Sequence, residues 1–424
     1  MRITIISDTH FGDPMGTLVT QDGDMKATIG PQYPAFKAAA GKNNNYLILV
    51  GDIFDFSISS YKEAYETAKV FFLQIQEDQI AEEIIFIPGN HDVDLWHTVE
   101  YETNIINQIK KHKPQRPFRR SVPGFIDDRK DSKFQGFTLS GVTAKKDPEK
   151  TKYAGLFLDH ITEPEGKSTP FNFAYPNVYM VTDNESVMIT HGHYLETYWA
   201  LVGEWSLKII QEDLRIGESM DLSEMTGINF PLSQLACSGV GQAGPLTNVI
   251  RQVQRDIKDG KLERISKYLS RLENELDNIA RFPWYKPYLE WMTDAAFKAL
   301  QSMILNMIKE AQDTRYNEEF IYKKDVQERF RNFYNATICE IHNLNMKYKY
   351  SIPVPWYVIF GHTHQPTSWG DENAPKTKPI LAADMKPVTL YNTGGWLKDK
   401  NDKFCGAEIF IYESGKGFSS VSIR

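Results

Sequence analysis

Cysteine is scarce in this sequence, and no long apolar stretch occurs. The 424 residues include three cysteines, Cys237, Cys339 and Cys405, which are widely separated and form no CxxC motif. We therefore expect no disulfide framework, and this favours a reducing compartment over secretion. No uncharged stretch of about 18 residues is predominantly apolar, so we expect no transmembrane helix. The N-terminal apolar run reaches Asp8 too early for a signal peptide, and together these absences predict a cytoplasmic protein.

An excess of positive charge is also absent. Lys and Arg number 48 against 55 Asp and Glu, which gives a net charge of −7. This balance argues against broad nucleic-acid binding, and we predict no dedicated nucleic-acid surface. One local basic run consists of Lys110, Lys111, Lys113, Arg116, Arg119 and Arg120. It either attracts an anionic substrate or forms a solvated helix end.

Five short apolar runs each end at a cluster of polar residues. Their Ile and Val content is typical of strands that are buried on both faces. The runs are Ile3–Ser7, Tyr46–Val50, Ile84–Pro88, Ser186–Ile189 and Trp356–Phe360. Helical patterns at Ser60–Glu82 and Thr98–Lys113 alternate with the early strands, which predicts an α/β layered core. Ligands of such folds bind at the carboxyl ends of strands, where all five polar clusters lie.

The rest of the sequence contains a strand-rich end and a long helical block. Pro387–Asn392, Gly406–Tyr412 and Phe418–Ile423 are predicted strands, which we expect to complete a second sheet. The helical block has predicted helices at Leu195–Ile216, Leu246–Asp259, Leu262–Arg281, Tyr285–Gln312 and Asn317–Lys347, and a loop at Met220–Gly244. We therefore predict a core of residues 1–193 and 351–424, with a helical insertion at 194–350. The insertion leaves and rejoins the core beside polar clusters, so it is placed to act as a cap.

The insertion is rich in aromatic residues, including Tyr198, Trp199, Trp205 and Trp291. These side chains either form the insertion's own core or present an apolar pocket, a lipid- or membrane-facing surface, or a subunit interface. Peripheral membrane contact and the oligomeric state are both left open by the sequence.

The polar clusters contain the donor groups that divalent metals bind. They comprise carboxylates, imidazoles and one amide, at Asp8, His10, Asp52, Asn90, His191, His362 and His364. Hard and borderline cations bind such mixtures, and Mn²⁺, Fe and Zn²⁺ are all candidates. A mononuclear zinc site has three or four protein ligands, so this larger set favours two metals that share a carboxylate. Taken singly, Asp52 could instead cap a helix, and an isolated histidine is more often structural.

The series DxH, GDxxD, GNHD, HGH and GHTH resembles the signature of the calcineurin-like metallophosphoesterase superfamily. All five blocks occur in the family's order between residues 8 and 364. The resemblance implies an α/β fold, a four-layer α/β/β/α sandwich, which would here carry a large helical insertion. It also implies a metal-dependent phosphoric ester hydrolase that acts on a phosphoester substrate.

The resemblance further implies a role for each motif residue. The first of two divalent metal ions would be bound by Asp8, His10 and His364. The second would be bound by Asn90, His191 and His362, and Asp52 would bridge the two. A metal-bridging hydroxide would attack phosphorus, while His91 would protonate the leaving group as general acid. Asp55 would orient His91, and Asp92 and His193 are further candidates for contacts around the centre.

One departure from the family and several alternatives bear on the substrate. Phe56 occupies the position at which protein phosphatases of the family have a phosphate-binding Arg, so we do not expect a protein Ser/Thr phosphatase. The alternatives are a lipid- or nucleotide-linked pyrophosphohydrolase similar to UDP-2,3-diacylglucosamine hydrolases, a nuclease, and a non-catalytic scaffold. The stretch Asn392–Trp396 resembles a segment of many bacterial members and is expected to shape the loop beneath the metals, or to be a plain turn.

Overall fold

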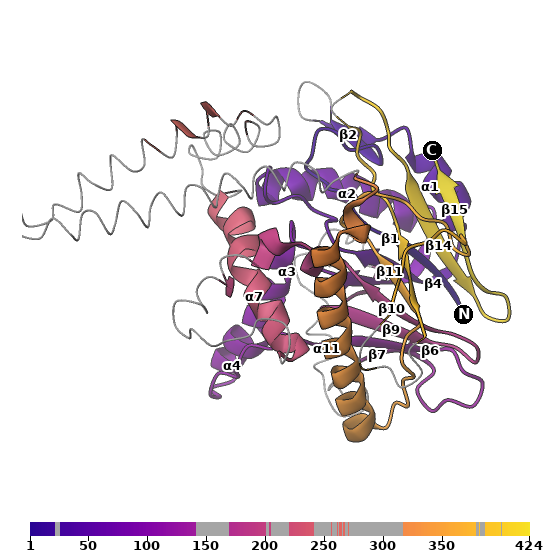
Figure 1. Cartoon of the computed structure of the whole chain (residues 1–424). Coiled ribbons are helices and arrows are strands. Elements are labelled where there is room, and N and C mark those ends of the chain that lie inside the picture. Colours follow the sequence, from indigo (N-terminus) through magenta and orange to yellow (C-terminus); the bar gives the residue numbers. More distant parts are fainter. Residues whose placement is uncertain are drawn as a thin grey trace, which may run out of the picture. The chain divides into compact units, whose positions relative to one another are not determined.

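The computed structural model describes residues 1–21, 26–140, 169–200, 220–240, 317–378, 386–399 and 401–424, with isolated positions between 203 and 270 and at 381 (Figure 1). The chain divides into two compact units, residues 1–242 with 318–424, and residues 243–317. In the second unit, the buried carboxylate of Asp256 pairs with Lys261 at 3.6 Å and with Arg264 at 3.4 Å. All the elements described below belong to the first unit.

The first sheet contains six strands in the order β15-β14-β1-β4-β5-β8. Their bounds are Gly417–Ile423, Ala407–Glu413, Arg2–Ile6, Asn44–Val50, Ala81–Ile87 and Phe171–Phe173. Strands β1, β4, β5 and β8 run parallel to one another, while β14 runs antiparallel to both of its neighbours, β1 and β15. The apolar run Leu47–Val50 in β4 is fully buried, as expected for a strand that is covered on both faces.

The second sheet contains seven strands in the order β12-β13-β11-β10-β9-β6-β7. Their bounds are Lys376–Thr377, Val388–Asn392, Tyr357–Phe360, Ser186–Thr190, Asn177–Val181, Gly124–Asp127 and Gly136–Leu139. Strands β10, β11 and β13 are parallel neighbours. Outside both sheets, β2 (Val19–Gln21) and β3 (Ala27–Ile29) form a small antiparallel pair.

The prediction that all three C-terminal strands complete the second sheet was wrong for two of them. Strand β13 does lie there, but β14 pairs with β1 and β15 pairs with β14, so both extend the first sheet. The register sets Ile3 opposite Tyr412 and Ile5 opposite Phe410, and all four side chains are buried. Strand pairing between distant segments depends on this burial, which the local sequence pattern does not reveal.

Helices cover the outer faces of the two sheets. Helix α1 (Tyr33–Ala40) and helix α2 (Tyr61–Glu77) lie against the first sheet, where Phe72 contacts Phe171 of β8 with ring centroids 5.4 Å apart. Helix α2 begins as predicted, because Ser60 and Glu63 form a capping box. It ends before the predicted Glu82, which belongs to β5.

The helical pattern predicted at Thr98–Lys113 begins earlier than expected. Helix α3 (Val93–Tyr101) starts directly after the GNHD motif and continues as the π-helix η1 (Glu102–Ile106) and helix α4 (Asn107–Lys110). The basic run therefore starts at the end of α4 and continues into a loop. Of its members, Arg119 donates to the Ser140 carbonyl at 3.1 Å, which is a structural contact.

The predicted loop at Met220–Gly244 was wrong. Helix α7 (Leu222–Gln234) begins there, followed by the π-helix η5 (Leu235–Val240). Asp221 and Glu224 form a capping box at its start, with Asp221 accepting from the Glu224 backbone at 2.7 Å. The Gly and Ser content suggested a loop, although the spacing of these two acidic residues is a helix-start signal.

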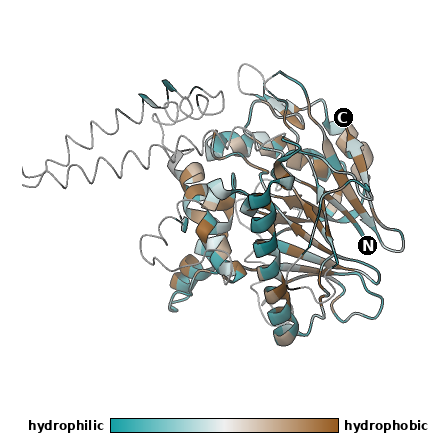
Figure 2. Cartoon of the chain, viewed as in Figure 1, coloured by the Kyte–Doolittle hydropathy of each residue, from teal (hydrophilic) through white to brown (hydrophobic). Residues whose placement is uncertain are grey.

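Helix α11 (Lys324–Tyr348) covers the second sheet, and it begins later than the predicted Asn317–Lys347 helix and ends one residue beyond it. Residues Thr337 and Glu340 contact β9, through Asn177 at 3.3 Å and Tyr179 at 2.8 Å. A short 3₁₀ helix, η7 (Phe320–Tyr322), precedes α11. Figure 2 shows hydrophobic colouring along the central strands and hydrophilic colouring over much of α11, as expected for an outer layer.

The first unit is thus an α/β sandwich of two sheets with helices on both outer faces, as predicted. Helices α7 and α11 belong to this unit, although their residues fall within the predicted insertion at 194–350. The predicted helices Leu195–Ile216, Leu246–Asp259, Leu262–Arg281 and Tyr285–Gln312 lie largely outside the described residues, as do Trp205 and Trp291. In the described part of the chain, no helix combines the length and apolar character needed to cross a membrane.

Candidate metal centre and catalytic site

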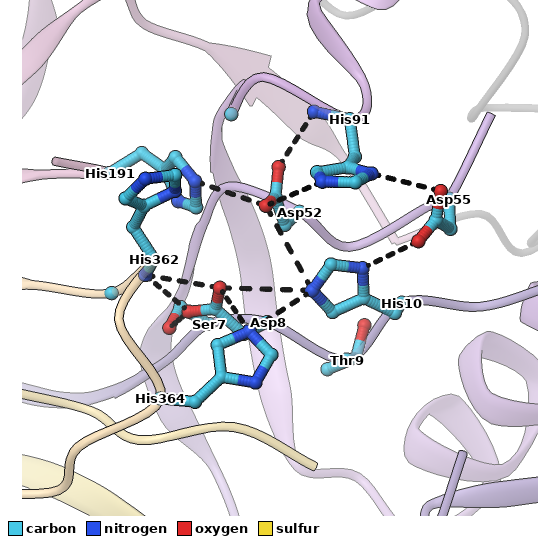
Figure 3. Close-up of polar contacts among 12 residues, drawn as sticks. Ser7, Asp8, Thr9, His10, Asp52, Asp55, His91, His191, His362 and His364 are labelled. Atoms are coloured by element: carbon cyan, nitrogen blue, oxygen red, sulfur yellow. Dashed lines mark hydrogen bonds and ion pairs between the residues drawn. The ribbon is translucent and has the colours of Figure 1, made fainter. Parts of the chain in front are cut away.

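The candidate residues lie in the loops that follow five parallel strands. Asp8 and His10 follow β1, Asp52 follows β4, and Asn90 follows β5 in the first sheet. In the second sheet, His191 follows β10, and the pair His362 and His364 follows β11. Both sheets present these carboxyl ends to the same place, so all seven predicted ligands come together. Figure 3 labels all of them except Asn90.

The first group of donor atoms comprises Asp8, His10 and His364. His364 Nε2 lies 3.2 Å from Asp8 Oδ1 and 3.3 Å from His10 Nε2. All three side chains are almost completely buried. Burial alone would raise the pKa of Asp8, but neighbouring His364 and His191 lower it. An ionised carboxylate and two imidazoles therefore meet at one point.

The second group comprises Asp52, His191 and His362, with Asn90 beside it. His191 Nε2 lies 3.2 Å from Asp52 Oδ2 and 3.1 Å from Asn90 Oδ1. The same Asp52 Oδ2 is 3.9 Å from His10 Nε2 in the first group. One carboxylate oxygen thus faces both groups, which is the geometry that a bridging ligand requires (Figure 3).

Asp52 and His191 also form an ion pair. Burial would lower the pKa of His191, but Asp52 outweighs it and raises this pKa to about 9. Burial would likewise raise the pKa of Asp52, whereas His191 and His91 hold it well below its usual value.

His91 lies beside this centre and is held by two partners. Its Nδ1 is 2.9 Å from Asp55 Oδ1 and 2.8 Å from Ser57 Oγ, while its Nε2 is 4.0 Å from Asp52 Oδ2. Asp55 Oδ2 also accepts from His10 Nδ1 at 2.9 Å. Asp55 therefore contacts His91, the residue that the resemblance expects it to orient, and it also contacts His10, a contact that the sequence reasoning missed.

The backbone at the site is strained. Five of the seven predicted ligands have a positive φ, between 47° and 68°: Asp8, His10, Asp52, His362 and His364. Such conformations cost of order 1–3 kcal/mol for residues with a side chain and concentrate at functional sites. Close packing adds a constraint at Gly361, where a Cβ atom would lie 2.2 Å from Asp8 Oδ2. Turns this tight aim several donors from one short loop at the same point.

The donor set fits divalent metal ions. It combines carboxylate oxygens, an amide oxygen and imidazole nitrogens, which suits Mn²⁺, Fe and Zn²⁺. Two buried nitrogen atoms at the centre, Asn90 Nδ2 and His362 Nε2, have no hydrogen bond within the described part of the chain, and both can donate one to a ligand or to a neighbouring side chain. Buried polar atoms without partners are rare in native proteins and often mark a ligand or ion site. The number and the identity of the metal ions remain predictions.

Asp92 joins two of the motif loops. It accepts backbone N–H groups from Ile53 at 2.8 Å, from Phe54 at 3.2 Å and from Gly89 at 2.6 Å. Burial, followed by the nearby Asp52 charge, raises the pKa of Asp92 to about 7. These hydrogen bonds connect the GDxxD loop to the GNHD loop. They explain why the GNHD motif ends in an aspartate.

His193 and Phe56, two residues beside the motif ligands, are both packed against aromatic rings. The His193 ring stacks on Tyr194 with centroids 3.9 Å apart. Both its nitrogens lack hydrogen bonds among the described residues, and burial with the nearby His191 holds its pKa well below normal. Phe56 is buried against Phe54 and Tyr61, with centroids 5.3 Å and 4.4 Å away, so this position belongs to the core.

The Asn392–Trp396 segment supports the two loops behind the first group. Asn392 Nδ2 donates to the Gly361 carbonyl at 2.6 Å and to Thr363 Oγ1 at 3.0 Å. The Trp396 backbone donates to the Asp8 carbonyl at 3.0 Å. Thr393 shares a hydrogen bond with Ser7, whose hydroxyl contacts Asp8. The segment therefore shapes the loops around the centre, as expected from its resemblance.

Two further residues near the centre were missed by the sequence reasoning as site residues. Glu196 Oε2 lies 3.3 Å from His362 Nε2. The Trp199 ring lies edge-on to His91, with centroids 5.8 Å apart, and its buried Nε1 has no partner among the described residues. Both follow the HGH motif closely, and that proximity is the one signal that the sequence offered.

Comparison with known proteins agrees with this geometry. A family model described as calcineurin-like phosphoesterase matches residues 1–195. The match includes the DxH, GDxxD, GNHD and HGH motifs, and the GHTH motif follows later in the chain. No curated protein matches the sequence. The matched residues contain four of the five motif loops that build the centre, and this part of the chain is therefore similar to the calcineurin-like phosphoesterase family.

Proposed function

We propose that this protein is a metal-dependent phosphoric ester hydrolase with a two-metal centre, and that its substrate is a phosphoester. One observation carries the proposal: Asp52 Oδ2 faces both groups of donors, and His91 Nε2 lies 4.0 Å from the same oxygen. A carboxylate placed between two groups of metal-binding donors, beside an imidazole, is an arrangement that supports metal-dependent hydrolysis of a phosphoester.

Each of the two groups of donors would bind one metal ion. Asp8, His10 and His364 would hold one ion, and Asn90, His191 and His362 would hold the other, with Asp52 between them. When bound, divalent cations stabilise the charge of a transferring phosphoryl group and activate water. We propose Mn²⁺ as the first ion to test, because the mixed oxygen and nitrogen donors accept it.

His91 would serve as the general acid. Its Nδ1–H donates to Asp55, which fixes the ring and stabilises the protonated form. Ser57 Oγ supports the same carboxylate by donating to Asp55 Oδ1 at 2.5 Å. With Nδ1 held in this way, Nε2 is directed toward the centre, where it can give a proton to the departing oxygen.

The direct test is hydrolysis of chromogenic phosphomonoesters and phosphodiesters by the full chain with added Mn²⁺. We expect turnover that chelators abolish and that His91→Ala lowers about 10²–10⁴-fold, the usual share of general acid catalysis. The exposed His112, at the end of α4, provides a matched control, and His112→Ala should act as wild type. Equal activity in His91→Ala and wild type would contradict the proposed role, and failure to bind any metal would contradict the proposed function.

A further inference from the structure

The residues that follow His191 pass along one side of the candidate centre. The short 3₁₀ helix η4 (His193–Leu195) leads away from β10, and Glu196 ends it with its backbone N–H on the His193 carbonyl at 3.2 Å. The side chain of Glu196 is only 9% exposed. A carboxylate this deeply buried is costly unless it is paired or hydrogen-bonded, so its surroundings need an explanation.

The carboxylate of Glu196 lies against one predicted metal ligand. Its Oε2 is 3.3 Å from Nε2 of His362, a ring that is itself 7% exposed. His362 forms a group of mutually close donor atoms with Asp52 and His191, and Glu196 is not a member of that group. Glu196 therefore contacts His362 from outside the group. The two atoms have the separation of a hydrogen bond but not yet its alignment.

Other histidines of the centre show what such a contact does. His191 has Nε2 at the donor group and Nδ1 2.9 Å from the Val50 carbonyl. His10 likewise has Nε2 at its group and Nδ1 2.9 Å from Asp55 Oδ2. A metal-binding imidazole usually donates its second N–H to a carboxylate or carbonyl, which fixes the ring and increases its basicity.

We propose that Glu196 is the positioning residue of His362 and thereby strengthens the second metal site. It would accept the Nε2–H of His362, hold the ring toward Asp52 and His191, and add one negative charge near the bound cation. The proposal rests on the two-metal function above, and it adds a residue for which the motif series has no place.

Metal binding tests this proposal without relying on turnover. Glu196→Gln keeps the shape of the side chain and removes its charge, whereas Glu196→Asp keeps the charge and draws it back from His362. The full chain, freed of metal with a chelator, is titrated with Mn²⁺ by calorimetry. We expect two binding events in wild type, with one weakened about 10–100-fold in Glu196→Gln, the usual effect of losing such a partner. The event assigned to Asp8, His10 and His364 should be unchanged.

Glu204 supplies the matched control. It is a largely buried carboxylate shortly after Glu196, and it pairs with Arg329 at 2.8 Å. We expect Glu204→Gln to keep both affinities. Equal weakening in Glu196→Gln and Glu204→Gln, or two unchanged affinities in Glu196→Gln, would overturn the proposal. Should Glu196→Gln not fold, an unchanged pair of affinities in Glu196→Asp would overturn it as well.

Failure of the proposed function gives a different pattern. In that case wild type itself binds no Mn²⁺ or hydrolyses no phosphoester, whichever residue stands at position 196. If wild type binds two ions and hydrolyses a phosphoester, and Glu196→Gln binds both ions with the same affinities, then only the proposed role of Glu196 is wrong.

Discussion

At the residue scale, the centre depends on close approach between loops as well as on its ligands. Gly89 precedes Asn90, and a Cβ atom at this position would lie 2.3 Å from Asp52 Oδ1. The same oxygen accepts the His91 backbone N–H at 2.8 Å. A side chain at Gly89 therefore displaces the carboxylate that faces both groups of donors.

We predict that Gly89→Ala lowers the affinity for Mn²⁺ by about tenfold or more, a loss typical of a disturbed ligand support. Calorimetric titration of the metal-free protein measures this change. Gly415 is a suitable control, because its Cβ would meet nothing within 4 Å although its φ is +81°. Gly415→Ala should cost stability through its backbone and leave metal affinity unchanged. Similar metal affinities in Gly89→Ala and Gly415→Ala would contradict the prediction.

Trp199 provides a second prediction at this scale. Its edge-on contact with His91 is of a type worth about 0.5–1.5 kcal/mol. We expect Trp199→Ala to lower kcat about threefold to tenfold by loosening the general acid, and Trp199→Phe to restore most of it. The pH profile of kcat separates this from simple unfolding, because His91 must be protonated to act as general acid and a change in its surroundings shifts the basic limb. An identical pH profile and an equal kcat in all three proteins would contradict the predicted effect of this contact on His91.

At the element scale, a buried carboxylate ties α11 to the second sheet. Glu340 accepts from Tyr179 at 2.8 Å and from Ser121. Burial nevertheless raises its pKa from 4.5 to about 7. Between these two values the folded protein keeps a proton that the unfolded chain has released, so stability falls as pH rises.

We therefore predict that Glu340 contributes a stability that is fully present below pH 4.5 and lost as pH rises to about 7. At about 1.4 kcal/mol per pH unit, the loss over this window is at most about 3.5 kcal/mol. Glu340→Gln carries no such proton, so its free energy of unfolding should lack this slope. Urea unfolding of both proteins from pH 4.5 to 8 measures the difference. Parallel curves for the two proteins would contradict the assignment.

The helices and strands that arise from local sequence patterns could be predicted, whereas the pairing of strands distant in the sequence could not. The five strands that precede motifs were predicted within a few residues, because their apolar runs are buried on both faces. Helix α7 was missed because Gly and Ser were given more weight than the capping box of Asp221 and Glu224. The place of β14 beside β1 could not be predicted, since it depends on pairing between distant segments.

The candidate site was more predictable than the sheet order, for a similar physical reason. Motif residues act through their own chemistry, so their spacing after strands already indicated which donors would meet. Glu196, Ser57 and Trp199 act through contacts with motif residues, and such contacts appear only in three dimensions. Their positions carry no spacing rule that a single sequence could reveal.

At the scale of the whole molecule, metal binding should be linked to stability. A ligand that binds only the folded state stabilises it by about 2.7 kcal/mol at a hundred times its Kd. We predict that saturating Mn²⁺ raises Tm by several degrees and that Asp52→Asn removes most of this gain, because Asp52 faces both groups. Thermal unfolding with and without chelator measures the effect. A Tm gain in Asp52→Asn equal to that of wild type would speak against a shared carboxylate.

The position of β1 between β4 and β14 has a consequence for synthesis on the ribosome. One edge of β1 acquires its partner early, but the other edge stays without β14 until roughly 400 more residues are made, some 20–80 s at usual rates. An unpaired apolar strand edge is a template for aggregation. Nascent chains of this protein should therefore depend on chaperones until β14 is released, and the donors on β11 join those on β1 only late in the same interval.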